Sequence, residues 1–128
     1  MCVNFTATAD RAEVVAAKIR AQGRQAIAVR ADVAKPEDVE RLFAETDRQL
    51  GCVEALVNNA AISIEAPIAD HDPAVMRRII DTNLLNPALT CRQAIRRMAT
   101  RRGGAGGVIV NISAISDVPR RTSGPNAP

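Results

Sequence analysis

Four short apolar runs alternate along this chain with longer segments of helical periodicity. The runs are built from Val, Ile, Leu and Ala with few aromatic residues, and they occupy Cys2–Phe5, Ala26–Val29, Val53–Val57 and Val108–Ile112. Strands that alternate with helices form βαβ units, in which the strands are parallel and helices cover the sheet. The pattern therefore predicts an α/β fold with a parallel sheet.

Three segments between these runs carry helix signals. Asp10 and Glu13 have the spacing of a capping box. Pro36 suits the first turn of a helix, where its missing N–H costs nothing. The third segment is long, and Pro87 interrupts it because proline cannot donate to the carbonyl four residues earlier. We expect helices over residues 10–23, 36–51 and about 73–98.

The composition excludes several classes of protein. A chain of 128 residues that is 47% hydrophobic suits one globular domain, which we place at residues 1–116. Residues 117–128 hold three prolines and no apolar periodicity, so we expect an irregular tail. No apolar stretch reaches the length of a membrane span. We therefore expect no membrane partner.

Charge and cysteine content add two further expectations. The net charge of +3 and the presence of only two aromatic residues argue against a nucleic-acid partner. Three widely spaced cysteines without a Cys/His cluster indicate no metal site and a cytoplasmic location. A group of arginines fits a solvated helix face better than a polyanion-binding patch. The group comprises Arg92, Arg96, Arg97, Arg101 and Arg102.

The third apolar run leads into two asparagines and two alanines. Small residues such as Ala60 and Ala61 let a flat ligand lie close to the backbone. Asn58 and Asn59 can hydrogen-bond neighbouring loops where the strand ends. The segment 56–61 is therefore a candidate for binding a ligand at the end of a strand.

Four motifs in a fixed order resemble the short-chain dehydrogenase/reductase family. They are Ala31-Asp32-Val33, Asn58-Asn59-Ala60-Ala61, Thr82-Asn83-Leu84 and Val110-Asn111-Ile112-Ser113. The resemblance covers residues 2–115 and implies a partial Rossmann-like, doubly wound parallel sheet in three α/β/α layers. The first and last strands of the family fold are missing, and removal of the central first strand should leave two half-sheets on either side of a gap.

The resemblance implies a nicotinamide cofactor over the carboxyl ends of the strands. Asp32 would hydrogen-bond the adenine amino group, with Val33 packed beside it. Asn59, Ala60 and Ala61 would pass under the adenosine ribose, although Ala61 stands where the family usually has glycine. The alternative for Asp32 is a loop aspartate that caps a turn.

Asn83 matches the active-site asparagine of the family. The resemblance implies a locally irregular helix there, with the Asn83 carbonyl holding a water of the proton relay. Pro87 supports this because it has no N–H to give to that carbonyl. The alternative is a helix kink that serves packing alone.

The choice between NAD and NADP depends on the end of the first run. A carboxylate there binds the ribose hydroxyls of NAD, and this chain offers none. Thr6 and Thr8 offer hydroxyls to a 2′-phosphate, with Arg11 as the first arginine that follows. The sequence favours NADP over NAD.

Three departures from the family affect catalysis. No Gly-rich turn precedes the first helix, and the segment 103–107 is no substitute because it opens a strand. Ala114 falls where the family has its catalytic serine, and the chain contains no tyrosine for a Tyr-x-x-x-Lys motif. The sequence therefore reads as an internal fragment with little or no turnover.

The resemblance implies an NAD(P)-dependent oxidoreductase that acts on a small alcohol or carbonyl compound. Two alternatives remain: a degraded gene product, and a non-catalytic module that pairs with a full-length relative. The helix that bears Asn83 would then mediate a homo- or hetero-oligomer through Leu85, Leu89 and Ile95.

Overall fold

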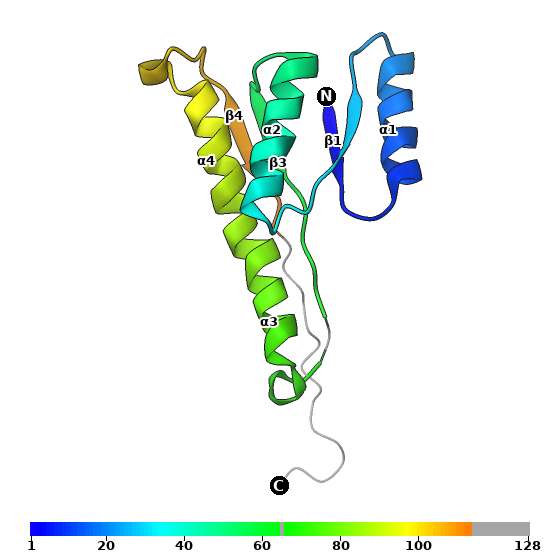
Figure 1. Ribbon diagram of the computed structural model, residues 1–128, viewed down its shortest axis with the longest axis vertical. Coiled ribbons are helices and arrows are strands. Elements are labelled where there is room, and N and C mark those ends of the chain that lie inside the picture. Colours follow the sequence, from blue (N-terminus) through cyan, green and yellow to red (C-terminus); the bar gives the residue numbers. More distant parts are fainter. Residues whose placement is uncertain (65, 114–128) are drawn as a thin grey trace, which may run out of the picture.

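The computed structural model describes residues 1–64 and 66–113, which form four strands and four main helical segments (Figure 1). All four strands run in the same direction, and each of two small sheets holds one parallel pair. The strands are β1 (Cys2–Phe5), β2 (Ile27–Arg30), β3 (Ala55–Asn58) and β4 (Val108–Asn111). The predicted α/β class is confirmed.

The helices follow the expected segments closely. They are α1 (Ala9–Ala21), α2 (Pro36–Leu50), α3 (Pro73–Ile80) and α4 (Asn86–Met98), with short 3-10 turns at Ile68–Asp70 and Thr100–Arg102. Pro36 begins α2 as predicted, and Gly51 ends it with a positive φ of 87°, which glycine adopts readily. The prediction that Asp10 and Glu13 form a capping box was wrong. Helix α1 starts at Ala9, after Thr8, and no side chain caps its first turn.

The long third helix is interrupted by a π-helical turn. Residues Asp81–Leu85 separate α3 from α4, and Pro87 stands in the first turn of α4. Proline removes the N–H that would bond the Asn83 carbonyl in an α-helix, so the chain widens there. The predicted irregularity at Asn83 is confirmed.

The sheet is split into two halves, as the sequence predicted. β1 pairs with β2, and β3 pairs with β4. No Cα atom of β1 lies within 8 Å of a Cα atom of β3, so these inner strands do not pair. A cavity of about 880 Å³ lies between the halves, lined by β1, β3 and α2.

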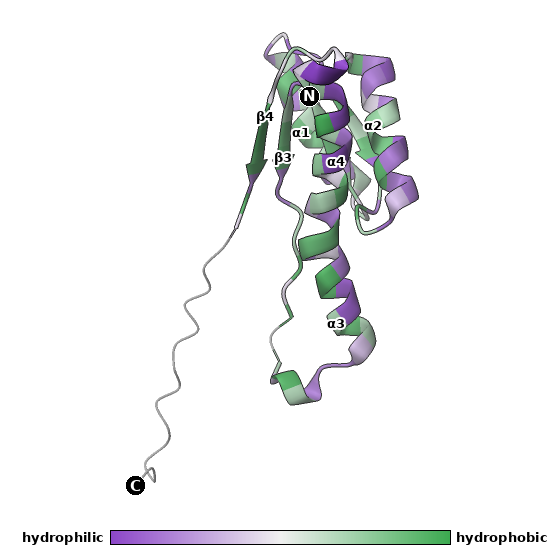
Figure 2. Cartoon of the chain, turned by 90° about the vertical axis from the view of Figure 1, so that its left-hand side faces the viewer, coloured by the Kyte–Doolittle hydropathy of each residue, from purple (hydrophilic) through white to green (hydrophobic). Residues whose placement is uncertain are grey.

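The helical layers are complete around one half-sheet only. Both α1 and α2 pack on β1 and β2 without contacting each other, so the β1–β2 sheet lies between two layers. The β3–β4 sheet is covered by α4, and its valines point away from that helix: Val57, Val108 and Val110 are 60%, 55% and 41% exposed. Both strands are strongly apolar (Figure 2).

The main core joins α2 to α4 and to the ends of the strands. Phe43 is 4% exposed at its centre, and Arg97 of α4 lies 5.1 Å from the centroid of its ring. Arg97 also donates to Asp47 at 2.7 Å, which links the two helices. The other core residues are Val29, Ala31, Val33, Val39, Leu42, Ala94 and Met98.

Two sequence predictions about side chains on α4 need correction. Arg97 is half-buried against α2, whereas the other four arginines of its group are exposed on a solvated face. Leu89 is partly buried and packs against the core, so it is not the exposed position that the sequence predicted. Leu85 and Ile95 are exposed as expected, at 41% and 45%.

The remaining expectations concern the glycine-rich segment, the end of the chain and membrane spans. The segment Gly103–Gly107 leads into β4, and an added Cβ would collide with the Arg97 carbonyl at Gly104 and with Met98 at Gly107, so these two glycines allow close packing. Ala114 and residues 117–128 lie outside the described residues. No described helix has the length and apolarity needed to cross a bilayer.

Candidate functional site

The predicted site residues gather where β1, β2 and β3 end. Because parallel strands bring their carboxyl ends to one edge, the loops that follow them are neighbours. These loops carry Thr6–Thr8, Asp32–Val33 and Asn59–Ala61. Helix α3 reaches the same edge through the side chain of Arg78.

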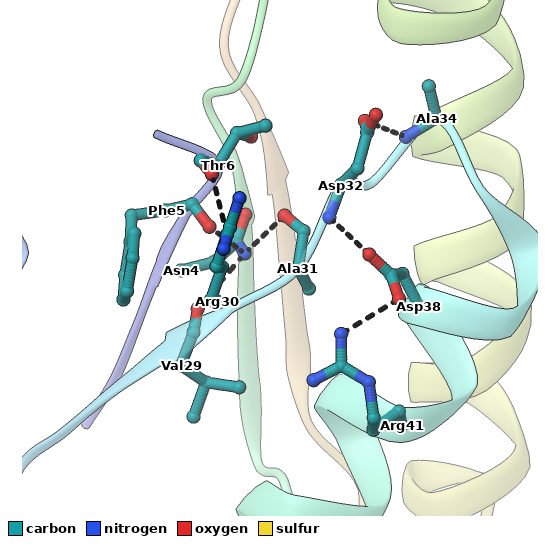
Figure 3. Close-up of polar contacts among 10 residues, drawn as sticks. All are labelled: Asn4, Phe5, Thr6, Val29, Arg30, Ala31, Asp32, Ala34, Asp38 and Arg41. Carbon is teal, nitrogen blue, oxygen red and sulfur yellow. Dashed lines mark hydrogen bonds and ion pairs between the residues drawn. The ribbon is translucent and has the colours of Figure 1, made fainter. Parts of the chain in front are cut away.

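Asp32 is held by three groups around the end of β2. Its Oδ1 accepts from the N–H of Ala34 at 3.1 Å, and its own N–H donates to Asp38 Oδ2 at 2.7 Å (Figure 3). The guanidinium of Arg78 donates to both carboxylate oxygens, at 2.9 and 3.1 Å. The turn-capping alternative is therefore observed, and the side chain remains 19% exposed.

The charge on Asp32 is stabilised by its partners. Partial burial raises the pKa of this carboxyl, but the hydrogen bonds from Arg78 and from the Ala34 N–H outweigh it, and the pKa is lowered. Asp32 is therefore ionised throughout the neutral range. Among the described residues Oδ2 accepts from Arg78 alone, so one of its lone pairs can still accept from a ligand.

The loop after β3 exposes small residues next to a fixed asparagine network. Asn58 is 8% exposed; its Oδ1 accepts from Thr90 at 2.7 Å, and its Nδ2 donates to Asn111 of β4 at 2.8 Å. Asn59 and Ala60 follow as exposed residues that line the cavity between the half-sheets. The first asparagine thus fixes the end of the strand, and the next residues face outward.

Asn83 ties the π-helical turn to the same loop. Its Oδ1 accepts from the N–H of Ile62, and its Nδ2 donates to the Ile62 carbonyl, both at 2.9 Å. Asn83 therefore holds the loop that begins at Asn59, and Arg78 of the preceding helix holds Asp32. Through these contacts the structure brings Asp32, Asn59 and Asn83 to one edge, while Val33 is buried in the core at 7% exposure.

Sequence reasoning missed two arginines at this edge. Arg78 lies 46 residues from Asp32 along the chain. The sequence could not single it out, because the adjacent Arg77 has the same side chain. Arg30 donates from Nε to the Thr6 carbonyl at 3.2 Å (Figure 3). The parallel register that pairs Phe5 with Arg30 puts it there, and no local motif indicates this.

Replacing Arg78 with leucine is expected to lower stability by about 0.5–1 kcal/mol at neutral pH, since the pair is partly exposed. The folded pKa of Asp32 lies below its unfolded value of about 3.9. The pair therefore adds stability above about pH 4 and loses it as the pH falls through the folded pKa. Urea denaturation at about pH 7 and about pH 3 should show a larger cost of the substitution at the higher pH.

The matched control for this prediction is Arg77→Leu. Arg77 is 76% exposed and comes no closer than 3.9 Å to Asp81, so its loss should change stability little at either pH. An equal cost for both substitutions, or a cost for Arg78→Leu that persists undiminished in acid, would contradict the role of Asp32.

Within the described part of the chain, no three His, Cys, Asp or Glu side chains are grouped as a metal site. The residues at the edge have a chemistry that suits the adenosine end of a dinucleotide: small exposed residues, an ionised carboxylate, and a guanidinium that contacts Thr6. No Gly-rich turn opens a helix within residues 1–64 and 66–113, so these residues do not supply the usual pyrophosphate site.

Comparison with known proteins places the chain in a family. The model of the short chain dehydrogenase family matches residues 1–124. The chain is 32% identical over 117 residues to the uncharacterized oxidoreductase YgfF of Escherichia coli, covering 91% of the chain and 47% of the relative. It is 32% identical over 115 residues to the 3-oxoacyl-[acyl-carrier-protein] reductase FabG of Staphylococcus epidermidis, covering 90% and 46%.

Solved structures agree with this assignment. A short chain dehydrogenase from Burkholderia cenocepacia in complex with NADP superposes with a TM-score of 0.80 at 27% identity, covering 92% of this chain and 47% of that chain. The chain thus spans about half the length of the relatives it matches. By its motifs, its fold and these matches, the chain belongs to the short chain dehydrogenase family.

Proposed function

We propose that this chain is the adenosine-binding half of an NAD(P)-dependent oxidoreductase of alcohols or carbonyl compounds, and that it transfers hydride poorly by itself. The observation that carries the proposal is the shared edge. There Asp32 is fixed by Arg78, and the loop from Asn59 is fixed by Asn83.

Each residue at the edge has a proposed role. Asp32 would accept a hydrogen bond from the adenine amino group through the free lone pair of Oδ2, with Val33 packed beneath the loop. Asn59, Ala60 and Ala61 would lie under the ribose, since their small, exposed surface allows close approach. Asn83 would position this loop through Ile62 and offer its carbonyl to a water. The cofactor supplies the hydride when it is bound.

NADP is the proposed cofactor. Thr8 precedes α1 and its side chain does not cap that helix, so within the described residues its hydroxyl can turn to a ligand. Arg30 lies against Thr6 and adds the positive charge that a 2′-phosphate needs. Support also comes from the NADP complex of the Burkholderia cenocepacia relative.

The proposal is tested by thermal denaturation with each cofactor. A ligand stabilises the folded chain by about 2.7 kcal/mol at about 100 times its Kd, and by less when it binds more weakly. At equal concentrations, NADP should therefore raise the melting midpoint more than NAD does. The Arg30→Ala substitution should reduce the effect of NADP to that of NAD, because the 2′-phosphate loses its cation.

Arg24→Ala is the control, because it removes the same positive charge at another place. Arg24 is exposed and follows the end of α1, whereas Thr6 precedes the start of that helix. That variant should keep the preference for NADP. A melting midpoint unchanged by NADP and NAD alike would overturn the proposed function, and equal loss in both variants would overturn the role of Arg30.

A further inference from the structure

The turn that carries Asp32 is fixed by its own neighbours in the chain. The Asp32 N–H donates to Asp38 Oδ2 at 2.7 Å, and the N–H of Ala34 donates to Asp32 Oδ1 at 3.1 Å (Figure 3). The N–H of Lys35 donates to the Asp32 carbonyl at 2.8 Å. All three contacts come from residues 32–38, so the backbone of the turn keeps its shape without a contact from α3.

The second carboxylate oxygen of Asp32 depends on a residue from another element. Within the described part of the chain, Oδ2 accepts from Nη1 of Arg78 alone, at 2.9 Å, while Nη2 of the same guanidinium donates to Oδ1 at 3.1 Å. Two N–H···O bonds from one planar guanidinium fix the plane of a carboxylate as well as its position. Arg78 is therefore the residue that decides where Oδ2 lies.

Without Arg78, the carboxylate of Asp32 could turn about its Cβ–Cγ bond. This torsion is broad in aspartate, because rotation there has no sharp staggered minima. The N–H of Ala34 holds one oxygen, and either oxygen can take that place. Since the side chain is 19% exposed, water would reach the other oxygen in several orientations. The contact with Arg78 thus selects one orientation among several.

We propose that Arg78 is a positioning residue that makes the adenosine site selective for a base with an amino group at C6. The inference rests on the proposed function, in which Oδ2 accepts a hydrogen bond from the adenine amino group. An ionised carboxylate can only accept, and hypoxanthine has a carbonyl oxygen where adenine has its amino group. A fixed Oδ2 pairs with adenine and faces a second acceptor in hypoxanthine. Arg78 acts through Asp32 and need not touch the base.

A mobile carboxylate would discriminate much less between these two bases. It could turn its unpaired oxygen away from the hypoxanthine carbonyl and let a water donate to that carbonyl instead. The hydrogen bond to adenine would then also cost the entropy of fixing the carboxylate. Loss of Arg78 should therefore weaken the binding of adenine and relieve the repulsion of hypoxanthine, which brings the two affinities together.

The positive charge of Arg78 has a separate effect on binding. NADP is an anion, so a cation near the site attracts it whatever base it carries. Arg77 precedes Arg78 on the same helix, is 76% exposed, and comes no closer than 3.9 Å to Asp81. The substitution Arg77→Leu therefore removes one positive charge from the same helix and leaves the contact with Asp32 intact.

The test measures the affinity of the 128-residue chain for NADP and for its deamino analogue, in which hypoxanthine replaces adenine, by isothermal titration calorimetry. The unsubstituted chain should bind NADP at least about tenfold more tightly than the analogue, since a site built for a donor rejects a ligand that lacks it. In Arg78→Leu this ratio should fall to within about threefold. In Arg77→Leu it should stay at about tenfold or more.

A double-mutant cycle tests whether Arg78 acts through Asp32. In Asp32→Asn the amide offers an oxygen to adenine and an N–H to hypoxanthine, so the ratio should lie within about threefold. Addition of Arg78→Leu to that variant should change the ratio no further, because the group that Arg78 positions is gone. Arg78→Lys keeps the charge but not the planar pair of donors, so it should restore overall affinity and only part of the ratio.

The ratio of affinities separates a positioning role from a structural one. A loss of folded protein lowers the apparent affinity for both cofactors by the same factor, so the ratio cancels it. A ratio in Arg78→Leu equal to that of the unsubstituted chain, or an equal fall in Arg77→Leu, would overturn the role of Arg78. Similar affinities of the unsubstituted chain for both cofactors would overturn the selectivity and leave the proposed function standing. Binding of neither cofactor would refute the proposed function itself.

Discussion

The 128-residue chain, given NADPH and a panel of aldehydes and ketones, is expected to oxidise NADPH at least about 10²-fold more slowly than a full-length relative. A positioned general acid contributes about 10²–10⁴-fold, and this chain has no tyrosine to protonate the developing alkoxide. Its two lysines are Lys18 in α1 and Lys35 at the start of α2, so neither adjoins Asn83 in the chain. The loss of NADPH absorbance measures the rate.

The Staphylococcus epidermidis reductase serves as the active comparator for this measurement. Weak turnover that persists in an Asn83→Ala variant would be background reaction. A rate close to that of the comparator, abolished by Asn83→Ala, would contradict the expectation and would place a proton donor that we have not identified beside Asn83.

Truncation of Phe43 to alanine is expected to cost about 3–5 kcal/mol of unfolding free energy. Phe43 is 4% exposed in the core that joins α2 to α4, and the cation–π contact with Arg97 adds about 0.5–1 kcal/mol. Small domains have only about 5–15 kcal/mol in total, so the variant should be largely unfolded when warmed. Urea denaturation followed by circular dichroism measures the loss.

Two controls separate this effect from a general intolerance of substitution. Val14→Ala removes apolar surface that is 54% exposed on α1, and it should stay within about 0.5 kcal/mol of the parent chain. Phe43→Leu keeps much of the volume and should fall between the two. Equal stability of Phe43→Ala and Val14→Ala would show that this core does not hold the halves together.

Local signals in the sequence were sufficient for the elements and their order. Alternating apolar runs and helical segments predicted all four strands within about two residues, a margin usual for such boundaries. Pro87 predicted the disturbance at Asn83 because its effect on a helix is local. The split sheet followed from the strand order that the family resemblance implies.

Long-range contacts were not predictable in the same way. The partners of Asp32 and Thr6 are arginines 46 and 24 residues away along the chain, and their identity depends on how α3 and β2 are placed. Arg97 and Leu89 were misassigned because the helical pattern alone does not say how wide the buried face of α4 is. The cofactor roles of Asp32, Val33, Asn59, Ala60, Ala61 and Asn83 remain proposals.

The π-helical turn at Asp81–Leu85 holds one residue more than an α-helical turn. Because it completes about the same rotation with that extra residue, deletion of one residue there would give a continuous α-helix and leave Arg78 close to Asp32. The loss would fall on the turn itself, where the side chain of Asn83 holds the backbone of Ile62. A shortening of this helix would therefore spare the distant ion pair and release the loop beside it.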